Sequence, residues 1–314
     1  MNTIPLGRSS LQSSAIAYGG WRLAGTYEGA QVTPEREAHG CAAVIAAFEA
    51  GCRLFDLADI YADGAAERIF GEALRHVPGM REQIVLATKC GIRKSGQPEP
   101  HSPYRYDFSK DYILQCCDES LARMGVETID LYMLHRPDFL GDPAEVAAAF
   151  QTLKDQGKVR EFGVSNFRPS QVAMLQAHCP MPLVVNQIEI SLSQPAAVHD
   201  GSLDYCLANT LTPLAWSPLA GGRLAPGATV SMQDPEHARK QKLYDVLDQI
   251  GRERGANRSQ IALAWLLRHP ARIVPIIGTT IPERIHEAIA ATTIELTREE
   301  WYRLYVAATG QKLP

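Results

Sequence analysis

The stretch "FDLADIYADGAAE" (residues 55–67) begins as a buried strand and then breaks into acids, a tyrosine and a glycine. It places Asp56, Asp59 and Tyr61 within six residues of one another. A strand followed by a polar loop and a helix cap would explain the pattern. A catalytic site at the end of the strand would also explain it, and the rest of the chain has to decide between the two.

Outward from this stretch, short apolar runs rich in Val, Ile and Leu alternate with helical patterns along the whole chain. Several runs are apolar on both faces, which is typical of parallel strands covered on both sides. The expected strands are 15–20, 53–58, 84–89, 129–135, 160–166, 183–190, 212–217 and 272–278. Eight strands alternating with helices over about 300 residues predict a (β/α)8 TIM barrel, an α/β fold, as one domain over 1–314. A doubly wound open sheet is the rival, but no G-x-G-x-x-G follows the first strand.

Three of the expected helices carry clear start and stop signals. They begin after caps at Thr33, Ser109 and Asp142, and each ends at a glycine shortly before the next strand.

The sequence also predicts elements in addition to the eight strands and eight helices of a simple barrel. Residues 1–20 offer two strand-like pieces around "GRSS", which predict a hairpin closing the barrel's bottom, and two extra helices are expected over 237–255 and 297–309.

The composition argues against several classes of partner. The 314 residues are 46% hydrophobic and 21% charged. The net charge of −4 favours neither nucleic acid nor an acidic membrane as a partner. The N-terminus lacks a signal-peptide pattern and no apolar run could span a bilayer, so we expect a soluble, cytoplasmic protein. The seven cysteines form no C-x-x-C pair and no His/Cys cluster, so no metal site is expected. Largely polar helical faces favour a monomer.

In a TIM barrel the chemistry lies at the C-terminal ends of the strands. Asp56, Lys89 and His135 end three consecutive strands, and Tyr61 can fold back over them. A nearby ammonium favours the phenolate of tyrosine, so Lys89 is expected to lower the pKa of Tyr61. With a carboxylate to hold the lysine and a histidine to bind the carbonyl, this set would protonate a carbonyl oxygen while a hydride is delivered to its carbon.

Six stretches, in the same order along the chain, resemble the aldo-keto reductases. They are "FDLADIYADGAAE", "LATKCG" (86–91), "IDLYMLHRPD" (129–138), "GKVREFGVSNF" (157–167), "NQIEIS" (186–191) and "WSPLAGGRL" (216–224). Within the family the chain looks most similar to bacterial YdhF-type oxidoreductases. The resemblance implies an NAD(P)H-dependent enzyme that reduces small-molecule carbonyl compounds, with Tyr61 as general acid, Lys89 and Asp56 tuning it, and His135 orienting the carbonyl.

The resemblance also implies a cofactor site. Ser165, Asn166 and Gln187 would hold the nicotinamide carboxamide, and Trp216 would stack on the ring. The remaining expected cofactor residues are Ser217, Leu219, Gly221 and Gly222 for the pyrophosphate, and Gly278, Thr279, Thr280 and Arg284 for the adenosine phosphate. Many members have Lys-Ser where Gly278 and Thr279 stand here. Arg284 is a good phosphate ligand, so NADPH is favoured over NADH, which stays possible.

The substrate pocket is expected between Trp21, the loop 93–109 with Tyr104, and the "RPDFLGD" turn (136–142). Two other functions stay open. A nucleotide-binding redox sensor or regulatory partner of the same fold would bind cofactor without turnover. A Schiff-base aldolase would use Lys89 as its nucleophile, and borohydride trapping would reveal it.

Overall fold

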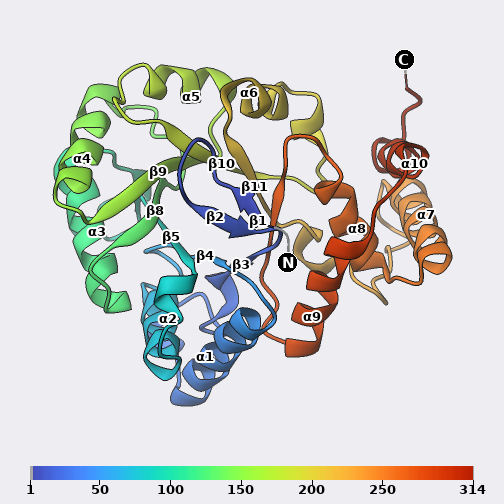
Figure 1. Cartoon of the computed structure of the whole chain (residues 1–314), viewed down its shortest axis with the longest axis horizontal. Coiled ribbons are helices and arrows are strands. Elements are labelled where there is room, and N and C mark those ends of the chain that lie inside the picture. The colour runs from blue at the N-terminus through green and yellow to red at the C-terminus, as the bar shows by residue number, and fades with distance from the viewer. Residues whose placement is uncertain (1–2, 314) are drawn as a thin grey trace.

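The computed structural model describes residues 3–313, and its centre is a closed barrel of eight parallel strands (Figure 1). The strands, in chain order, are β3 (Ala17–Gly19), β4 (Leu54–Asp56), β5 (Val85–Cys90), β8 (Ile129–Leu134), β9 (Val159–Ser165), β10 (Leu183–Glu189), β11 (Thr212–Trp216) and β12 (Val274–Ile277). β12 pairs with β3 in parallel and closes the ring. All eight expected strands and the (β/α)8 barrel are therefore confirmed.

The helices surround this barrel as its outer layer (Figure 1). The α-helices are α1 (Pro34–Glu49), α2 (Ala65–His76), α3 (Lys110–Met124), α4 (Pro143–Asp155), α5 (Pro169–Gln176), α6 (Ser202–Asn209), α7 (His237–Arg254), α8 (Arg258–Leu267), α9 (Pro282–Ala290) and α10 (Arg298–Thr309). Short 3₁₀ turns are η1 (Gly20–Arg22), η2 (Gly29–Gln31), η3 (Arg81–Gln83), η4 (Ala196–Val198), η5 (Ala220–Gly222) and η6 (Ala291–Thr293). The two extra helices, α7 and α10, pack together beside the barrel, and Arg254 joins them through Nη2–Oε2 of Glu300 at 2.7 Å.

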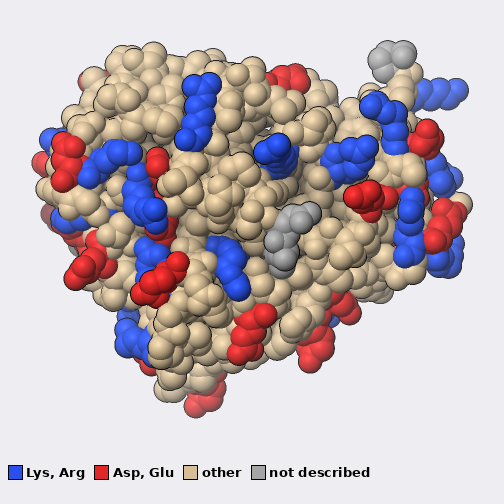
Figure 2. All heavy atoms as spheres, viewed as in Figure 1, with Lys and Arg blue, Asp and Glu red and all other residues tan. Residues whose placement is uncertain are grey.

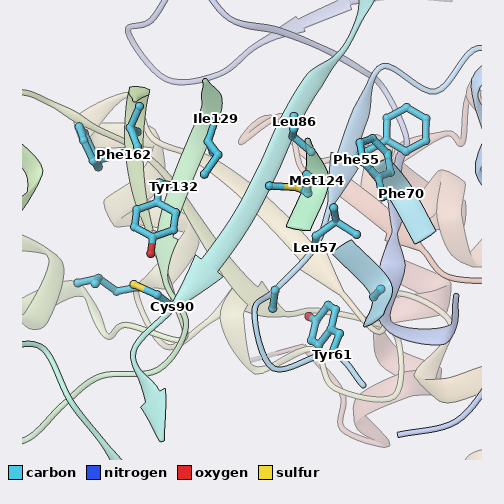
Figure 3. Packing of buried hydrophobic residues seen from close by; sticks show 14 of the residues in the cluster. Phe55, Leu57, Tyr61, Phe70, Leu86, Cys90, Met124, Ile129, Tyr132 and Phe162 are labelled. Atoms are coloured by element: carbon cyan, nitrogen blue, oxygen red, sulfur yellow. The ribbon is translucent and has the colours of Figure 1, made fainter. Parts of the chain in front are cut away.

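The barrel strands are buried on both faces, which explains their continuous apolar runs. Side chains such as Leu54, Val85 and Leu131 fill the interior as one cluster. Phe55, Leu86, Tyr132 and Phe162 belong to a second cluster that the strands share with the surrounding helices (Figure 3).

The N-terminal hairpin closes the barrel's bottom, as expected for the part of it that is described. β1 (Thr3–Pro5) pairs antiparallel with β2 (Gln12–Ser14), and Leu6 and Leu11 join the interior cluster. Gly7 has φ +56°, and a Cβ there would lie 2.6 Å from the carbonyl oxygen of Val184, so only glycine fits this close approach. Residues 1 and 2 of the expected hairpin lie outside the described residues.

Two of the three expected helix caps form. The side chains of Thr33 and Asp142 accept hydrogen bonds from the backbone N–H groups of Arg36 and Ala144. Ser109 precedes α3 as expected, but the prediction that its hydroxyl caps the helix was wrong. The hydroxyl instead donates to Asp107 Oδ1 at 2.6 Å, because a charged carboxylate two residues upstream is the stronger partner.

The surface mixes both signs of charge. On the face that carries the hairpin, Lys and Arg side chains alternate with Asp and Glu without a single-sign patch (Figure 2). No helix in the described part of the chain is long and apolar enough to cross a membrane. No group of three or more metal-ligating side chains occurs among residues 3–313.

Candidate active site

Lys89 lies at the centre of the site. Its side chain is fully buried, and Nζ donates to Asp56 Oδ2 at 2.9 Å, to the carbonyl oxygen of Leu57 at 2.6 Å and to Tyr61 Oη at 3.2 Å. An ammonium has three donors, so every one of them is used. The strand ends of β4 and β5 and the loop after β4 thus bring Asp56, Tyr61 and Lys89 together.

The electrostatics of this cluster differ from the expectation in one respect. Burial lowers the pKa of Lys89, but Asp56 and Tyr61 outweigh burial and leave it above its usual value. Burial raises the pKa of Tyr61, and the opposing effect of the Lys89 ammonium is smaller, so the predicted lowering is wrong. The physical reason is that Asp56 already compensates the lysine charge and Tyr61 is only 9% exposed. Tyr61 is therefore a protonated donor throughout the neutral range.

His135 faces the tyrosine from the end of β8. The two ring centroids lie 5.8 Å apart in an edge-on arrangement, and the histidine is 6% exposed. Burial, followed by the charges of Lys89 and Arg136, lowers the pKa of His135 well below its ordinary value. The imidazole is therefore neutral, with one ring nitrogen as a donor and the other as an acceptor. Its Nδ1 is buried and has no hydrogen-bond partner among the described residues.

A hydrogen-bond chain runs from Asp56 across the barrel mouth to Trp216. Gln187 Nε2 donates to Asp56 Oδ1 at 2.8 Å, and Ser165 Oγ donates to the Gln187 carbonyl oxygen at 3.0 Å. Asn166 Nδ2 donates to Ser165 Oγ at 2.8 Å, and Trp216 Nε1 donates to Asn166 Oδ1 at 2.9 Å. Four strands, β4, β9, β10 and β11, contribute to this chain, and the indole of Trp216 is thereby held in place.

The loop after β11 has a left-handed backbone at four positions. Ser217, Ala220, Gly221 and Gly222 all have positive φ, between 50° and 99°. Left-handed backbone at non-glycine residues is costly and occurs mainly at functional sites. A Cβ on Gly222 would meet nothing within 4 Å, so the backbone here faces open space. The half-buried Leu219 packs against both large apolar clusters and anchors the loop.

The end of β12 adds a second open segment. Gly278, Thr279 and Thr280 are half-buried, and the Thr279 carbonyl oxygen accepts a hydrogen bond from Tyr18 Oη at 3.1 Å. α9 begins two residues later, and Arg284 is exposed in its first turn. Helix N-termini favour anions, and Arg284 adds a positive charge at this one.

Aromatic side chains surround the mouth. Trp21 is 48% exposed and stands edge-on to Tyr61, with the ring centroids 5.1 Å apart. Tyr104 is exposed on the β6–β7 hairpin (Ile92–Arg93 and Arg105–Tyr106), whose Tyr106 contacts Phe139 of the "RPDFLGD" turn. The loop 93–109 and this turn therefore lie side by side, as expected of two neighbouring pocket walls.

Asp63 joins three of the loops at the mouth. Its carboxylate accepts a hydrogen bond from the backbone N–H of Gly29 at 2.7 Å and forms a salt bridge with Lys94. Gly29 follows β3, Asp63 follows β4, and Lys94 follows β5 and β6. This contact could not be predicted from the sequence, because a single sequence does not indicate which charged side chains of different loops form a salt bridge.

Asp59, near the cluster of Asp56, Tyr61 and Lys89, has a different environment from Asp56. Its Oδ1 is buried without a hydrogen-bond partner among the described residues, and Cys116 and Glu67 lie near its carboxyl group. Burial, reinforced by the Glu67 charge, raises the pKa of Asp59 from 3.8 to about 7. Asp59 is therefore a carboxyl group that takes up its proton near neutral pH in the folded chain.

Asp59→Asn is expected to stabilise the protein more at pH 8 than at pH 5. The folded state binds more protons than the unfolded state between pH 3.8 and about 7, so stability falls as pH rises through that window. A shift of about 3 units is worth at most about 4 kcal/mol, and we expect about 2 kcal/mol, because the residue as a whole is half-buried although its Oδ1 is buried. Urea unfolding at both pH values measures the difference. An equal effect at both pH values would contradict the assignment.

Comparison with known proteins places these residues in context. The Aldo/keto reductase family model matches residues 15–307. The 6-dehydroglucose reductase of Novosphingobium aromaticivorans is 42% identical over 98% of this chain and 96% of its own length. Oxidoreductase YdhF of Escherichia coli is 39% identical over 84% of this chain and 85% of its own, which confirms the expected similarity.

A solved structure shares the whole fold. The aldo/keto reductase from Klebsiella pneumoniae, in complex with NADP and acetate, superposes with a TM-score of 0.76. It is 25% identical and covers 96% of this chain and 93% of its own.

Proposed function

The chain belongs to the aldo/keto reductase family and is an NAD(P)H-dependent oxidoreductase, and we propose that it reduces aldehydes and ketones to alcohols with NADPH, using Tyr61 as the general acid. The observation that carries the proposal is the contact of 3.2 Å between Lys89 Nζ and Tyr61 Oη. Asp56 accepts a second hydrogen bond from the same Nζ and so fixes the position of the lysine. The pairing leaves a protonated tyrosine beside a fixed cation, which is what protonation of a carbonyl oxygen requires.

The reduced nicotinamide, when bound, supplies the hydride. Tyr61 Oη gives its proton to the carbonyl oxygen, and the Lys89 ammonium stabilises the phenolate that remains. The neutral His135 donates a hydrogen bond to the same oxygen and so orients the carbonyl. Asp56 keeps Lys89 charged, and Gln187 keeps Asp56 in place through its Nε2 contact.

At the strand ends, two side-chain amides keep hydrogen-bonding groups that are free to bind a cofactor. Both donors of Asn166 Nδ2 are used, by Ser165 and by the His135 carbonyl oxygen, and Oδ1 keeps one lone pair beside the Trp216 contact. Gln187 keeps one amide hydrogen. A carboxamide offers a donor and an acceptor, so we propose that these groups hold it while Trp216 stacks on the ring.

Phosphate binding is proposed at the two open backbone segments. Ser217 and the 219–222 turn would hold the pyrophosphate, and Gly278, Thr279, Thr280 and Arg284 the adenosine phosphate. The similar structure from Klebsiella pneumoniae contains NADP, which supports a phosphorylated dinucleotide here.

Two observations bear on the substrate and on the aldolase alternative. The relative named 6-dehydroglucose reductase suggests that a hexose aldehyde belongs in any substrate panel. A Schiff-base nucleophile has to be a neutral amine with a free lone pair. Lys89 has all three donors engaged and a raised pKa, which favours the reductase over the aldolase.

Arg284→Ala is expected to raise the Kd for NADPH about tenfold and to leave that for NADH within twofold, since a lost charge-assisted phosphate contact is worth roughly 1.5 kcal/mol. Quenching of tryptophan fluorescence, to which Trp216 should contribute, measures both constants, and absorbance at 340 nm follows turnover of 4-nitrobenzaldehyde. Arg298→Ala, an exposed arginine at the start of α10, is the matched control. Tight binding without turnover of any aldehyde would support the sensor function instead, and no binding of either nucleotide would refute the proposed site.

A further inference from the structure

Arg136 follows His135 at the end of β8 and takes no part in the transfer of hydride or proton. Its guanidinium carbon lies 5.6 Å from the centroid of the Trp216 ring, and the residue is half-buried. Among residues 3–313 the guanidinium has no hydrogen-bond acceptor, and no carboxylate lies within 4.0 Å of it. This is an unusual state for an arginine at such a depth, because a partly desolvated charge is costly unless it is paired.

The other half-buried arginines of the described chain show the contrast. Each of them donates to a carboxylate or to a backbone carbonyl oxygen: Arg53, Arg81, Arg93, Arg105, Arg123, Arg239 and Arg258. The nearest acid along the chain, Asp138, accepts hydrogen bonds from the backbone N–H groups of Phe108 and Leu140. Arg136 is therefore the exception, and it lies at the mouth of the active site.

The charge of Arg136 acts on the reacting groups. It contributes to lowering the pKa of His135, and it opposes the burial that raises the pKa values of Tyr61 and Tyr104. The Lys89 ammonium is neutralised by Asp56. Arg136 thus supplies an uncompensated positive charge close to Tyr61 and His135.

We propose that Arg136 is a substrate-binding residue that takes the carboxylate of an anionic carbonyl substrate while Tyr61 and His135 hold its carbonyl oxygen. The inference rests on the reductase function proposed above and narrows its substrate class. A guanidinium binds a carboxylate through two parallel hydrogen bonds, and a single arginine matches a singly charged group. The exposed aromatic side chains of Trp21, Tyr104 and Phe139 suit an apolar body between the two polar ends.

The experiment compares matched substrates in wild type and Arg136→Gln. The substrates are 3- and 4-carboxybenzaldehyde and their methyl esters, which have a similar shape and lack the charge. We expect the ratio of kcat/KM for acid over ester to fall at least tenfold in Arg136→Gln and to recover in part in Arg136→Lys, which keeps the charge without the bidentate fork. Arg160→Gln removes one charge at the opposite end of the barrel and should leave the ratio within twofold.

Binding measurements separate the possible failures. Isothermal titration with 4-(hydroxymethyl)benzoate needs no turnover and should show binding that weakens at least tenfold in Arg136→Gln. If wild type reduces none of the four aldehydes, the reductase proposal fails, and this titration alone decides the anion site. An acid-over-ester ratio that does not change overturns the inference. So does an equal loss for acid and ester accompanied by a higher Kd for NADPH, which would make Arg136 a cofactor residue.

Discussion

Tyr61→Phe lowers kcat/KM for aldehyde reduction by about 10²–10⁴-fold, the usual contribution of a positioned general acid. The hydroxyl is the only group removed, and its described contact is the one with Lys89 Nζ. The ring keeps its edge-on packing against Trp21 and His135, so the fold and the affinity for NADPH are retained. Initial rates at 340 nm and tryptophan fluorescence measure the two quantities separately.

The interpretation of this variant depends on where the loss occurs. A fall in kcat with an unchanged Kd for NADPH assigns proton transfer to Tyr61. A variant that keeps more than a tenth of the wild-type kcat/KM would show that another group, or water, protonates the carbonyl oxygen.

Lys89→Met destabilises the fold by about 3–5 kcal/mol, because it leaves Asp56 as an unpaired buried charge. Asp56 is 3% exposed, and Gln187 alone cannot compensate a full negative charge. The double variant Asp56→Asn/Lys89→Met removes the charge and should recover most of the loss. Urea unfolding of the wild type, both single variants and the double variant gives the coupling free energy of the pair.

Activity in this set should not follow stability. The double variant folds but lacks the cation that stabilises the phenolate, so its kcat stays low. If Lys89→Met were as stable as wild type, Asp56 would have to be protonated or solvated in the folded state. Activity of the double variant near the wild-type level would remove Lys89 from the proton-transfer step.

The strand ends could be predicted from the sequence because burial on both faces leaves continuous apolar runs that stop where polar side chains begin. Asp56, Lys89 and His135 were placed together for that reason. What the sequence could not show is the balance of opposing effects. The pKa of Tyr61 depends on how far burial exceeds a compensated lysine charge, and this depends on geometry across two strands.

The sequence also could not show which polar side chains lack a hydrogen-bond partner or change it in the folded chain. Arg136 was part of a quoted motif, yet its lack of an acceptor is a property of everything around it. Ser109 looked like a cap until a nearby carboxylate, Asp107, proved the better acceptor for its hydroxyl. Asp59 looked like an ordinary loop acid, because its burial is created by α2 and α3 folding over it. In each case the sequence gives the residue type, but only the fold shows which side chains surround it.

The contact of Asp63 with Gly29 and Lys94 has a consequence for how this enzyme can diversify. Three loops at the barrel mouth share one carboxylate, so a change in one of them affects the other two. Replacing a single loop with that of a relative would leave either the aspartate or one of its two partners without its contact. Substrate range should therefore change through exchanges that carry all three loops together, or through point changes at the rim that leave this junction untouched.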